Sequence, residues 1–90
     1  WLEDAHNVRI SGLEAKDHTS EQALVRIKEC TNVTFTGYDG RGRIPLLMRV
    51  SGAGTGRIKL AGNDLTRVGR HVERSAEVAP EAIIEKYNFE

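Results

Sequence analysis

The chain has 90 residues, which allows one small domain with a modest core. Its 13 basic and 13 acidic side chains cancel, so the net charge gives no reason to expect nucleic acid or an anionic membrane as a partner. No apolar run approaches the roughly 20 residues that a membrane-spanning helix needs. A single cysteine, Cys30, excludes an internal disulfide and a thiolate metal cluster.

The same short pattern occurs three times along the chain, at a fixed period of about 25 residues. Its three columns are Val8, Val33 and Ile58; Ile10, Phe35 and Leu60; and Gly12, Gly37 and Gly62. Apolar residues that alternate with polar ones predict a half-buried β-strand. The glycine after each strand predicts a bend. Because the period is fixed, the sequence predicts a solenoid in which each repeat forms one coil.

A second strand is expected in each coil after a polar loop. Residues 23–28 place Val25 and Ile27 inside, and residues 46–51 resemble them, with Met48 and Val50 at the matching positions. The third coil matches poorly, because residues 72–75 are almost wholly polar. Residues 1–6 are expected to be the tail of a preceding element.

The fourth repeat departs from the pattern. Ile83 falls on the period of Val8, Val33 and Ile58, but Glu85 and Tyr87 stand where an apolar residue and glycine are expected. Such a change predicts an end coil with a polar cap.

We therefore expect an all-β, right-handed parallel β-helix segment of three to four coils in one domain, residues 1–90. The coils are placed at about 7–31, 32–56 and 57–81, with an end coil at 82–90. Stacking at about 4.8 Å would set like on like, including an amide ladder of Asn7 and Asn32. A short solenoid exposes apolar core at its ends, so we expect it to continue in a parent chain or to stack on a partner, such as a homo-oligomer.

The repeats Asn-Val-Arg-Ile-Ser-Gly-Leu (7–13) and Asn-Val-Thr-Phe-Thr-Gly-Tyr (32–38) resemble the right-handed parallel β-helix superfamily. That group includes pectate-lyase-like enzymes and other polysaccharide lyases, inulin fructotransferases, polygalacturonases and phage tailspikes. The resemblance implies a secreted, often trimeric protein that acts on a polysaccharide as a lyase, fructotransferase or glycosidase, with most of the site outside this segment. The alternative is a non-catalytic spike or adhesin segment that binds sugar, because fold alone does not give function.

The repeat period places three carboxylates in one column, Glu14, Asp39 and Asp64. Two such groups can act as acid and base on a glycosidic bond, which makes these residues the candidate catalytic groups. We expect no cofactor and no resident metal; three carboxylates can in principle hold Ca²⁺, but nothing else in the sequence supports that alternative. The alternative is that they are ordinary turn residues with basic neighbours.

Basic side chains form a second candidate site for an acidic polysaccharide or oligosaccharide. Its candidate substrate-binding residues are Arg26, Arg41, Arg43 and Arg49. Arginine pairs bidentately with carboxylates, which supports this hypothesis. The alternative is a solvated strand surface that discourages aggregation. No aromatic residue interleaves this row, and we expect Trp1 and Phe89 to cover the ends of the coil.

Overall fold

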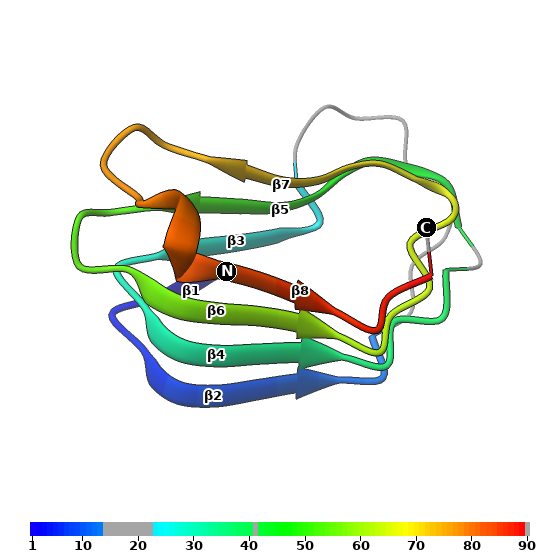
Figure 1. Cartoon of the computed structure of the whole chain (residues 1–90), viewed down its shortest axis with the longest axis horizontal. Coiled ribbons are helices and arrows are strands. Elements are labelled where there is room, and N and C mark those ends of the chain that lie inside the picture. The colour runs from blue at the N-terminus through cyan, green and yellow to red at the C-terminus, as the bar shows by residue number, and fades with distance from the viewer. Residues whose placement is uncertain (14–22, 41, 90) are drawn as a thin grey trace.

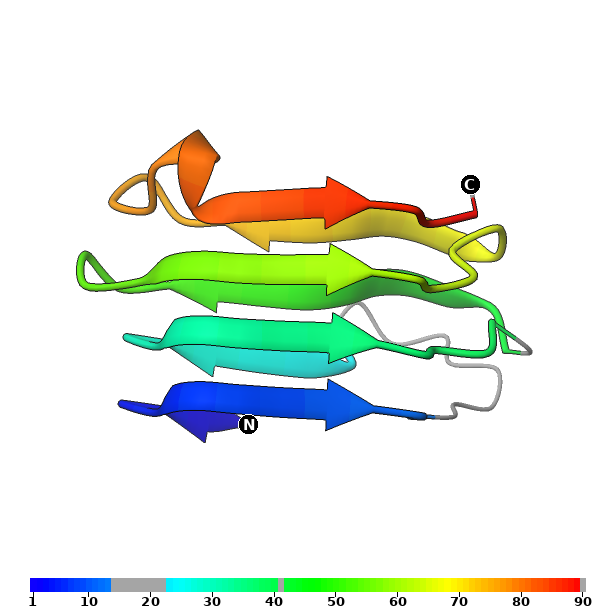
Figure 2. The same cartoon turned by 60° about the horizontal axis from the view of Figure 1, so that its bottom comes forward.

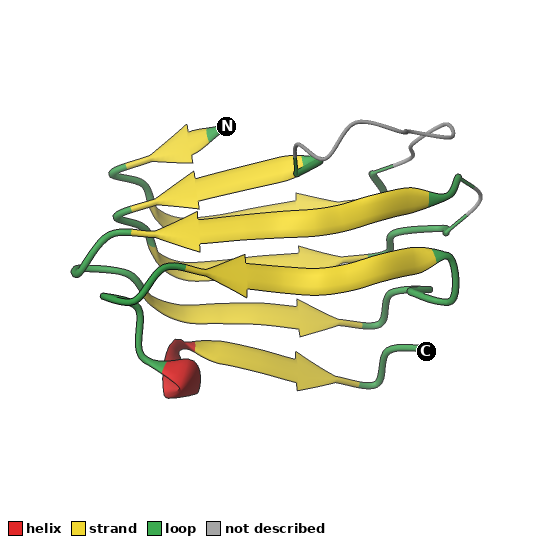
Figure 3. Ribbon diagram, turned by 90° about the horizontal axis from the view of Figure 1, so that it is seen from above, coloured by secondary structure: helices red, strands yellow, loops and turns green. Residues whose placement is uncertain are grey.

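The computed structural model describes residues 1–13, 23–40 and 42–89, and it is a parallel β-solenoid (Figure 1). Each coil contributes one strand to each of two four-stranded sheets. Sheet A contains β1 (Leu2–Glu3), β3 (Val25–Lys28), β5 (Ile44–Ser51) and β7 (Val68–Arg74) in that order (Figure 3). Sheet B contains β2 (His6–Ser11), β4 (Thr31–Thr36), β6 (Gly56–Ala61) and β8 (Ile83–Lys86). The 3₁₀-helix η1 (Pro80–Ala82) precedes β8, and no helix in the described ranges is long and apolar enough to cross a membrane.

The register of both sheets follows the sequence repeat. In sheet B each strand pairs with the next at the period of the repeat, which sets Val8, Val33, Ile58 and Ile83 in one column. In sheet A, Val25 pairs with Met48 and Ile27 with Val50, as the likeness of residues 23–28 to residues 46–51 predicts. Every strand pair is parallel, and the coils lie one above another as separate layers (Figure 2). The predicted stacked-coil architecture is therefore confirmed.

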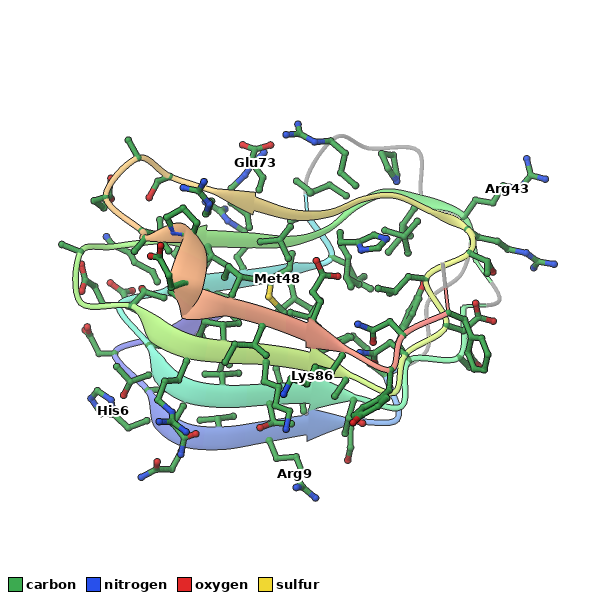
Figure 4. All side chains as sticks on the ribbon, in the orientation of Figure 1. His6, Arg9, Arg43, Met48, Glu73 and Lys86 are labelled. Carbon is green, nitrogen blue, oxygen red and sulfur yellow. The ribbon has the colours of Figure 1, made fainter. Side chains whose placement is uncertain are left out.

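The core lies between the two sheets. Sheet B supplies four fully buried side chains, Val33, Phe35, Ile58 and Leu60. Sheet A faces them with Ile27, Met48 and Val50, and Met48 lies between the sheets in Figure 4. In β5 the alternation is interrupted, because the consecutive residues Leu47 and Met48 are both fully buried. Leu46 is thereby directed to the outer side of sheet A, where it lines a depression with Arg49.

The predicted bend after each sheet B strand is confirmed by its backbone. Gly12, Gly37 and Gly62 have φ of 68°, 72° and 68°, a left-handed conformation that glycine adopts without strain. Tyr87 holds the same position in the last coil and has φ of 58°. The stacked bend is therefore retained in the end coil although its glycine is replaced.

The predicted amide ladder also forms. Asn32 Nδ2 donates to Asn7 Oδ1 at 2.6 Å, and both residues have positive φ. Asparagine is one of the few non-glycine residues that adopt this conformation routinely. One residue type therefore serves both the turn and the contact between coils.

The end coil replaces apolar core by a polar pair, as expected. Glu85 is the register partner of Leu60, and its Oε1 lies 2.7 Å from Nδ1 of His71 on β7. The poor match predicted for residues 72–75 was misleading, since β7 extends over Val68–Arg74 and pairs with β5. An outermost strand needs backbone pairing and only a few inward apolar side chains, here Val68 and Val72.

Candidate functional site

Two members of the predicted carboxylate column lie on neighbouring coils. Asp64 donates its backbone N–H to the Tyr38 carbonyl at 3.0 Å, which aligns Asp64 with Asp39. The Asp64 side chain packs on the backbone of Gly40, where an added Cβ would stand 2.7 Å from Asp64 Cγ. Glu14 lies outside the described residues. The backbones of Asp39 and Asp64 are thus aligned on neighbouring coils.

The environment of Asp64 favours its ionised form. Asp64 Oδ1 accepts hydrogen bonds from the Thr66 hydroxyl at 2.7 Å and from the Thr66 N–H at 3.1 Å. These bonds, with a contribution from Arg67, lower the pKa of Asp64. A carboxylate in this state can act as a base or an oxygen ligand, but it is a poor proton donor at neutral pH.

Tyr38 lies beside both carboxylates. Its ring is 2% exposed, and its hydroxyl has no hydrogen-bond partner within the described ranges. Burial, and then the charges of Asp39 and Asp64, raise the pKa of Tyr38. Because the hydroxyl is buried, Tyr38 supports the bend and does not reach a sugar on the surface.

Two asparagines, the buried Asn63 and the half-buried Asn88, build the same bend. Asn63 Oδ1 accepts the Tyr38 N–H at 3.0 Å, and Asn63 Nδ2 donates to the Phe35 carbonyl at 3.1 Å. Asn88 Oδ1 accepts from both the Nδ2 and the backbone N–H of Asn63, each at 3.0 Å. Asn88 Nδ2 then donates to the Leu60 carbonyl at 3.0 Å.

Sequence reasoning missed this pair. The available signal was that the two asparagines follow the repeat period and stand directly after the bend positions 62 and 87. These bonds fix the bend from which Asp39 and Asp64 project.

The basic residues of sheet A form a second site on its outer face. Arg26 and Arg49 are register partners on β3 and β5. They line a depression of about 210 Å³ with Trp1, Ile27, Lys28 and Ser51. The ring of Trp1, which is 68% exposed, lies 4.1 Å from Arg26 Cζ. The depression is smaller than a typical ligand pocket and suits one part of an extended ligand.

The aromatic partner of this face was not expected from the sequence. Trp1 does not cover the end of the coil, as we expected, but stacks on the side chain of Arg26 in the next coil. Phe89 is 73% exposed, so little of its surface packs on the coil. The sequence alone does not show this contact, because it depends on the register of sheet A. Leu2 pairs with Ile27, so the preceding residue, Trp1, lies beside Arg26.

Most basic side chains on this face form ion pairs, but Arg26 does not form one within the described residues. Arg49 Nε and Arg70 Nη1 each lie 3.4 Å from a Glu73 oxygen, and Lys28 Nζ lies 3.8 Å from Glu3. Exposed pairs of this kind contribute about 0–1 kcal/mol. Arg26 contacts Trp1 and forms no ion pair within the described part of the chain. Its donors are therefore available to a ligand.

Arg43 lies apart from this pair. It precedes β5, six residues before Arg49, which corresponds to about 20 Å along a strand. In Figure 4 the Arg43 side chain points outward at the bend, whereas Glu73 marks the outer face of sheet A. Arg41 lies outside the described residues. Arg26 and Arg49 are thus the two predicted binding residues that the fold brings together.

The opposite face offers a natural comparison. Arg9, Thr34 and Lys59 are register partners on the outer side of sheet B. Arg9 and Lys59 are exposed, and the intervening Thr34 separates the two charges. Among the residues that the structure describes, no aromatic ring stacks on the basic side chains of this face.

No group of three His, Cys, Asp or Glu side chains within residues 1–13, 23–40 and 42–89 is placed to hold a metal ion. Because Glu14 is outside these ranges, the Ca²⁺ hypothesis for the complete column stays a prediction. Comparisons with known proteins yield no match to a family model, to a curated protein or to a solved structure.

Proposed function

We propose that this chain is part of a carbohydrate-active parallel β-helix protein, of the pectate-lyase-like type, and that it binds an acidic polysaccharide on the outer face of sheet A. The observation that carries the proposal is the stack of Arg26 on Trp1 beside Arg49. It combines guanidinium groups, which pair bidentately with carboxylates, with an exposed aromatic ring. We propose an extracellular setting, where such polysaccharides occur.

The arrangement suits an extended ligand. Arg26 and Arg49 stand on adjacent strands, about 4.8 Å apart along the solenoid axis. A sugar chain that lies along this axis meets Arg49, Arg26 and Trp1 in turn. Arg49 must leave Glu73 to bind a sugar carboxylate, and this exchange costs little because both side chains are more than a third exposed.

The stacking contact prepares Arg26 for binding. A cation over an indole ring is held in one orientation, and the contact contributes about 0.5–1 kcal/mol at an exposed site. The guanidinium edge keeps its donors for a ligand while its plane covers the ring. Less conformational entropy is then lost when a carboxylate binds.

A second candidate function is cleavage of the sugar chain by Asp39 and Asp64. Their alignment on neighbouring coils favours it, since the strand spacing of about 4.8 Å is close to the carboxylate separation of retaining glycosidases. In this hypothesis the ionised Asp64 acts as the base or nucleophile, and Asp39 is the second carboxyl group of the pair. The carboxylates lie at the bend after sheet B, away from the face that holds Arg26, so binding and cleavage are separable by mutation.

Binding is tested by calorimetric titration with oligogalacturonates and with neutral galactose oligomers of equal length. Arg26→Ala and Arg49→Ala should each weaken binding of the acidic oligomer about tenfold or more, because a charge-assisted hydrogen bond contributes about 1.5–3 kcal/mol. The matched controls are Arg9→Ala and Lys59→Ala on the opposite face, which remove the same charge. Equal losses in all four variants, or no binding by the parent, would overturn the proposal.

Cleavage is tested separately by the release of new reducing ends and of unsaturated products. Turnover that Asp39→Asn and Asp64→Asn abolish while binding persists supports the enzyme hypothesis. Binding without turnover in the parent chain supports a sugar-binding spike or adhesin segment. Turnover that both variants retain would exclude these two carboxylates as catalytic residues.

A further inference from the structure

The outer side of sheet B carries basic and hydroxyl side chains in an ordered array. Its outward positions alternate with the inward-facing side chains of the four strands, and the register sets them in two columns. The strands lie side by side and nearly parallel in the front layer of Figure 2. We call this array the sheet B face; it consists of Arg9, Thr34, Lys59 and Ile84 in one column and Ser11, Thr36, Ala61 and Lys86 in the other.

The cations of the sheet B face have no described acidic partner. Arg9, Lys59 and Lys86 are exposed, and none of them forms an ion pair within residues 1–13, 23–40 and 42–89. Figure 4 shows Arg9 pointing away from the core. Glu85, the neighbour of Lys86 in β8, pairs instead with His71 on the opposite sheet. The described part of the chain therefore leaves these three charges without a counter-charge.

Sheet A differs in this respect. Lys28 pairs with Glu3, and Arg49 and Arg70 share Glu73. The 13 basic and 13 acidic side chains cancel over the whole chain, but the sheet B face holds three basic residues and no acidic one. A surface with one sign of charge attracts ions of the opposite sign even when the net charge is zero. The neutral total of the chain therefore does not describe this face.

The three charges are spread over an area and do not lie on one line. Arg9 and Lys59 stand two strands apart, about 10 Å along the solenoid axis, with Thr34 between them. Lys86 stands on the next strand and two residues further along, about 8 Å from Lys59. A single chain of anions crosses such an array in one direction, whereas a flat anionic surface meets all three charges together.

The remaining side chains of the face suit phosphate groups. The hydroxyls of Ser11, Thr34 and Thr36 can donate hydrogen bonds to phosphate oxygens. The eight residues of the face include no aromatic ring, so the face itself lacks a surface on which nucleobases or sugar rings stack. Its chemistry therefore favours a surface of phosphate groups over a nucleic acid or a sugar chain.

We infer that the sheet B face docks on the surface of an anionic phospholipid bilayer. Each lysine or arginine held near such a surface strengthens binding about fivefold, so the three cations together strengthen it about a hundredfold. The inference is independent of the proposed sugar binding, because the core separates this face from the outer face of sheet A. A bilayer and a polysaccharide can therefore be bound at the same time.

The test measures cosedimentation of the chain with vesicles of phosphatidylcholine alone and with vesicles of equimolar phosphatidylcholine and phosphatidylglycerol. Lys59→Gln and Lys86→Gln each remove one charge from the sheet B face, and Thr34→Lys adds one at its centre. The matched control is Arg70→Gln, which removes the same charge from an exposed position on sheet A. Circular dichroism establishes that each variant keeps the β spectrum of the parent.

The parent should bind the mixed vesicles and not those of phosphatidylcholine alone, and added salt should release it because exposed charges are screened. Lys59→Gln and Lys86→Gln should each weaken binding about fivefold, Thr34→Lys should strengthen it about fivefold, and Arg70→Gln should leave it nearly unchanged. Absence of binding by the parent, or an equal loss in Arg70→Gln, would overturn the inference. Equally tight binding to soluble polyphosphate would also overturn it, because the occupant would then be a linear polyanion.

Discussion

Replacement of Asn63 by alanine should be among the most destabilising changes in the chain. The side chain has no exposed surface, and its two ends bind the Tyr38 N–H and the Phe35 carbonyl. Alanine leaves both backbone groups buried and unpaired, at about 1–3 kcal/mol each, so the expected loss is about 2–6 kcal/mol. That is a large part of the total stability of a small domain, which is about 5–15 kcal/mol.

The assay is urea denaturation followed by circular dichroism, with Asn7→Gly as the matched control. Asn7 forms one exposed amide contact, and glycine retains its positive φ of 58°, so the control should cost about 0.5 kcal/mol or less. The result that would refute the reasoning is a loss below about 1 kcal/mol for Asn63→Ala, or equal losses for the two variants. Either outcome would mean that water or a rearranged bend satisfies the two backbone groups.

Three further predictions concern the same bend. Gly40→Ala should destabilise the fold by at least about 1 kcal/mol more than Gly12→Ala. Both glycines have positive φ, so the backbone strain of the substitution is the same in the two variants. They differ in space: a Cβ at Gly40 would stand 2.6 Å from the Asp64 carbonyl oxygen, whereas nothing lies within 4 Å of a Cβ at Gly12. Equal losses in thermal denaturation would contradict this contact. Tyr38→Phe should leave stability at neutral pH unchanged or higher, since the hydroxyl has no described partner. Because the folded-state pKa of Tyr38 is raised, the fold favours the protonated side chain, and this preference is fully present below about pH 10. As pH rises further, ionisation of Tyr38 lowers the free energy of unfolding of the parent but not of Tyr38→Phe. Identical alkaline unfolding of the parent and the variant would contradict the raised pKa. Because the folded-state pKa of Asp64 is lowered, the ionised side chain stabilises the fold above about pH 4, and this stabilisation is lost as pH falls further. Asp64→Asn should therefore make the free energy of unfolding less dependent on pH below about pH 4. An unchanged pH dependence in the variant would refute the lowered pKa.

The coil architecture could be predicted from the sequence because it depends on repetition. Columns such as Val8, Val33 and Ile58 repeat at a fixed spacing, and parallel stacking is the arrangement that uses this spacing. The shorter spacing between β3 and β5 in sheet A was also readable, since Val25 and Met48 carry the same alternation. Both signals are local and survive changes in loop length.

The end strands were harder to read because they lack one neighbour. Residues of β7 are mostly polar, yet the strand forms since its backbone pairs with β5 and Val72 covers the core. The two-residue strand β1 carries no periodic signal of its own and is defined by the pair of Leu2 with Ile27. Such strands form because their backbones pair with a neighbouring strand, and their own sequence pattern does not predict them.

The candidate sites could be predicted only in part. The alignment of Asp39 with Asp64 followed from the period, because the backbone hydrogen bonds between the coils continue in register through the bend. The contact of Trp1 with Arg26 could not be predicted from the period. It joins a terminal residue to an outward side chain, and it depends on the pairing of β1 with β3, for which the sequence carries no repeat signal. Arg43 was grouped with Arg49 by charge, although a whole strand length separates them.

The most direct test of the account is a set of methyl–methyl nuclear Overhauser effects along one core column. The parallel stack predicts that Val33 contacts both Val8 and Ile58, and that Ile58 contacts both Val33 and Ile83. Observation of this chain of contacts would establish the coil register on which the bend and the binding face depend. Contacts of Val33 with residues from an antiparallel neighbour, in place of Val8 and Ile58, would contradict the solenoid and every inference built on it.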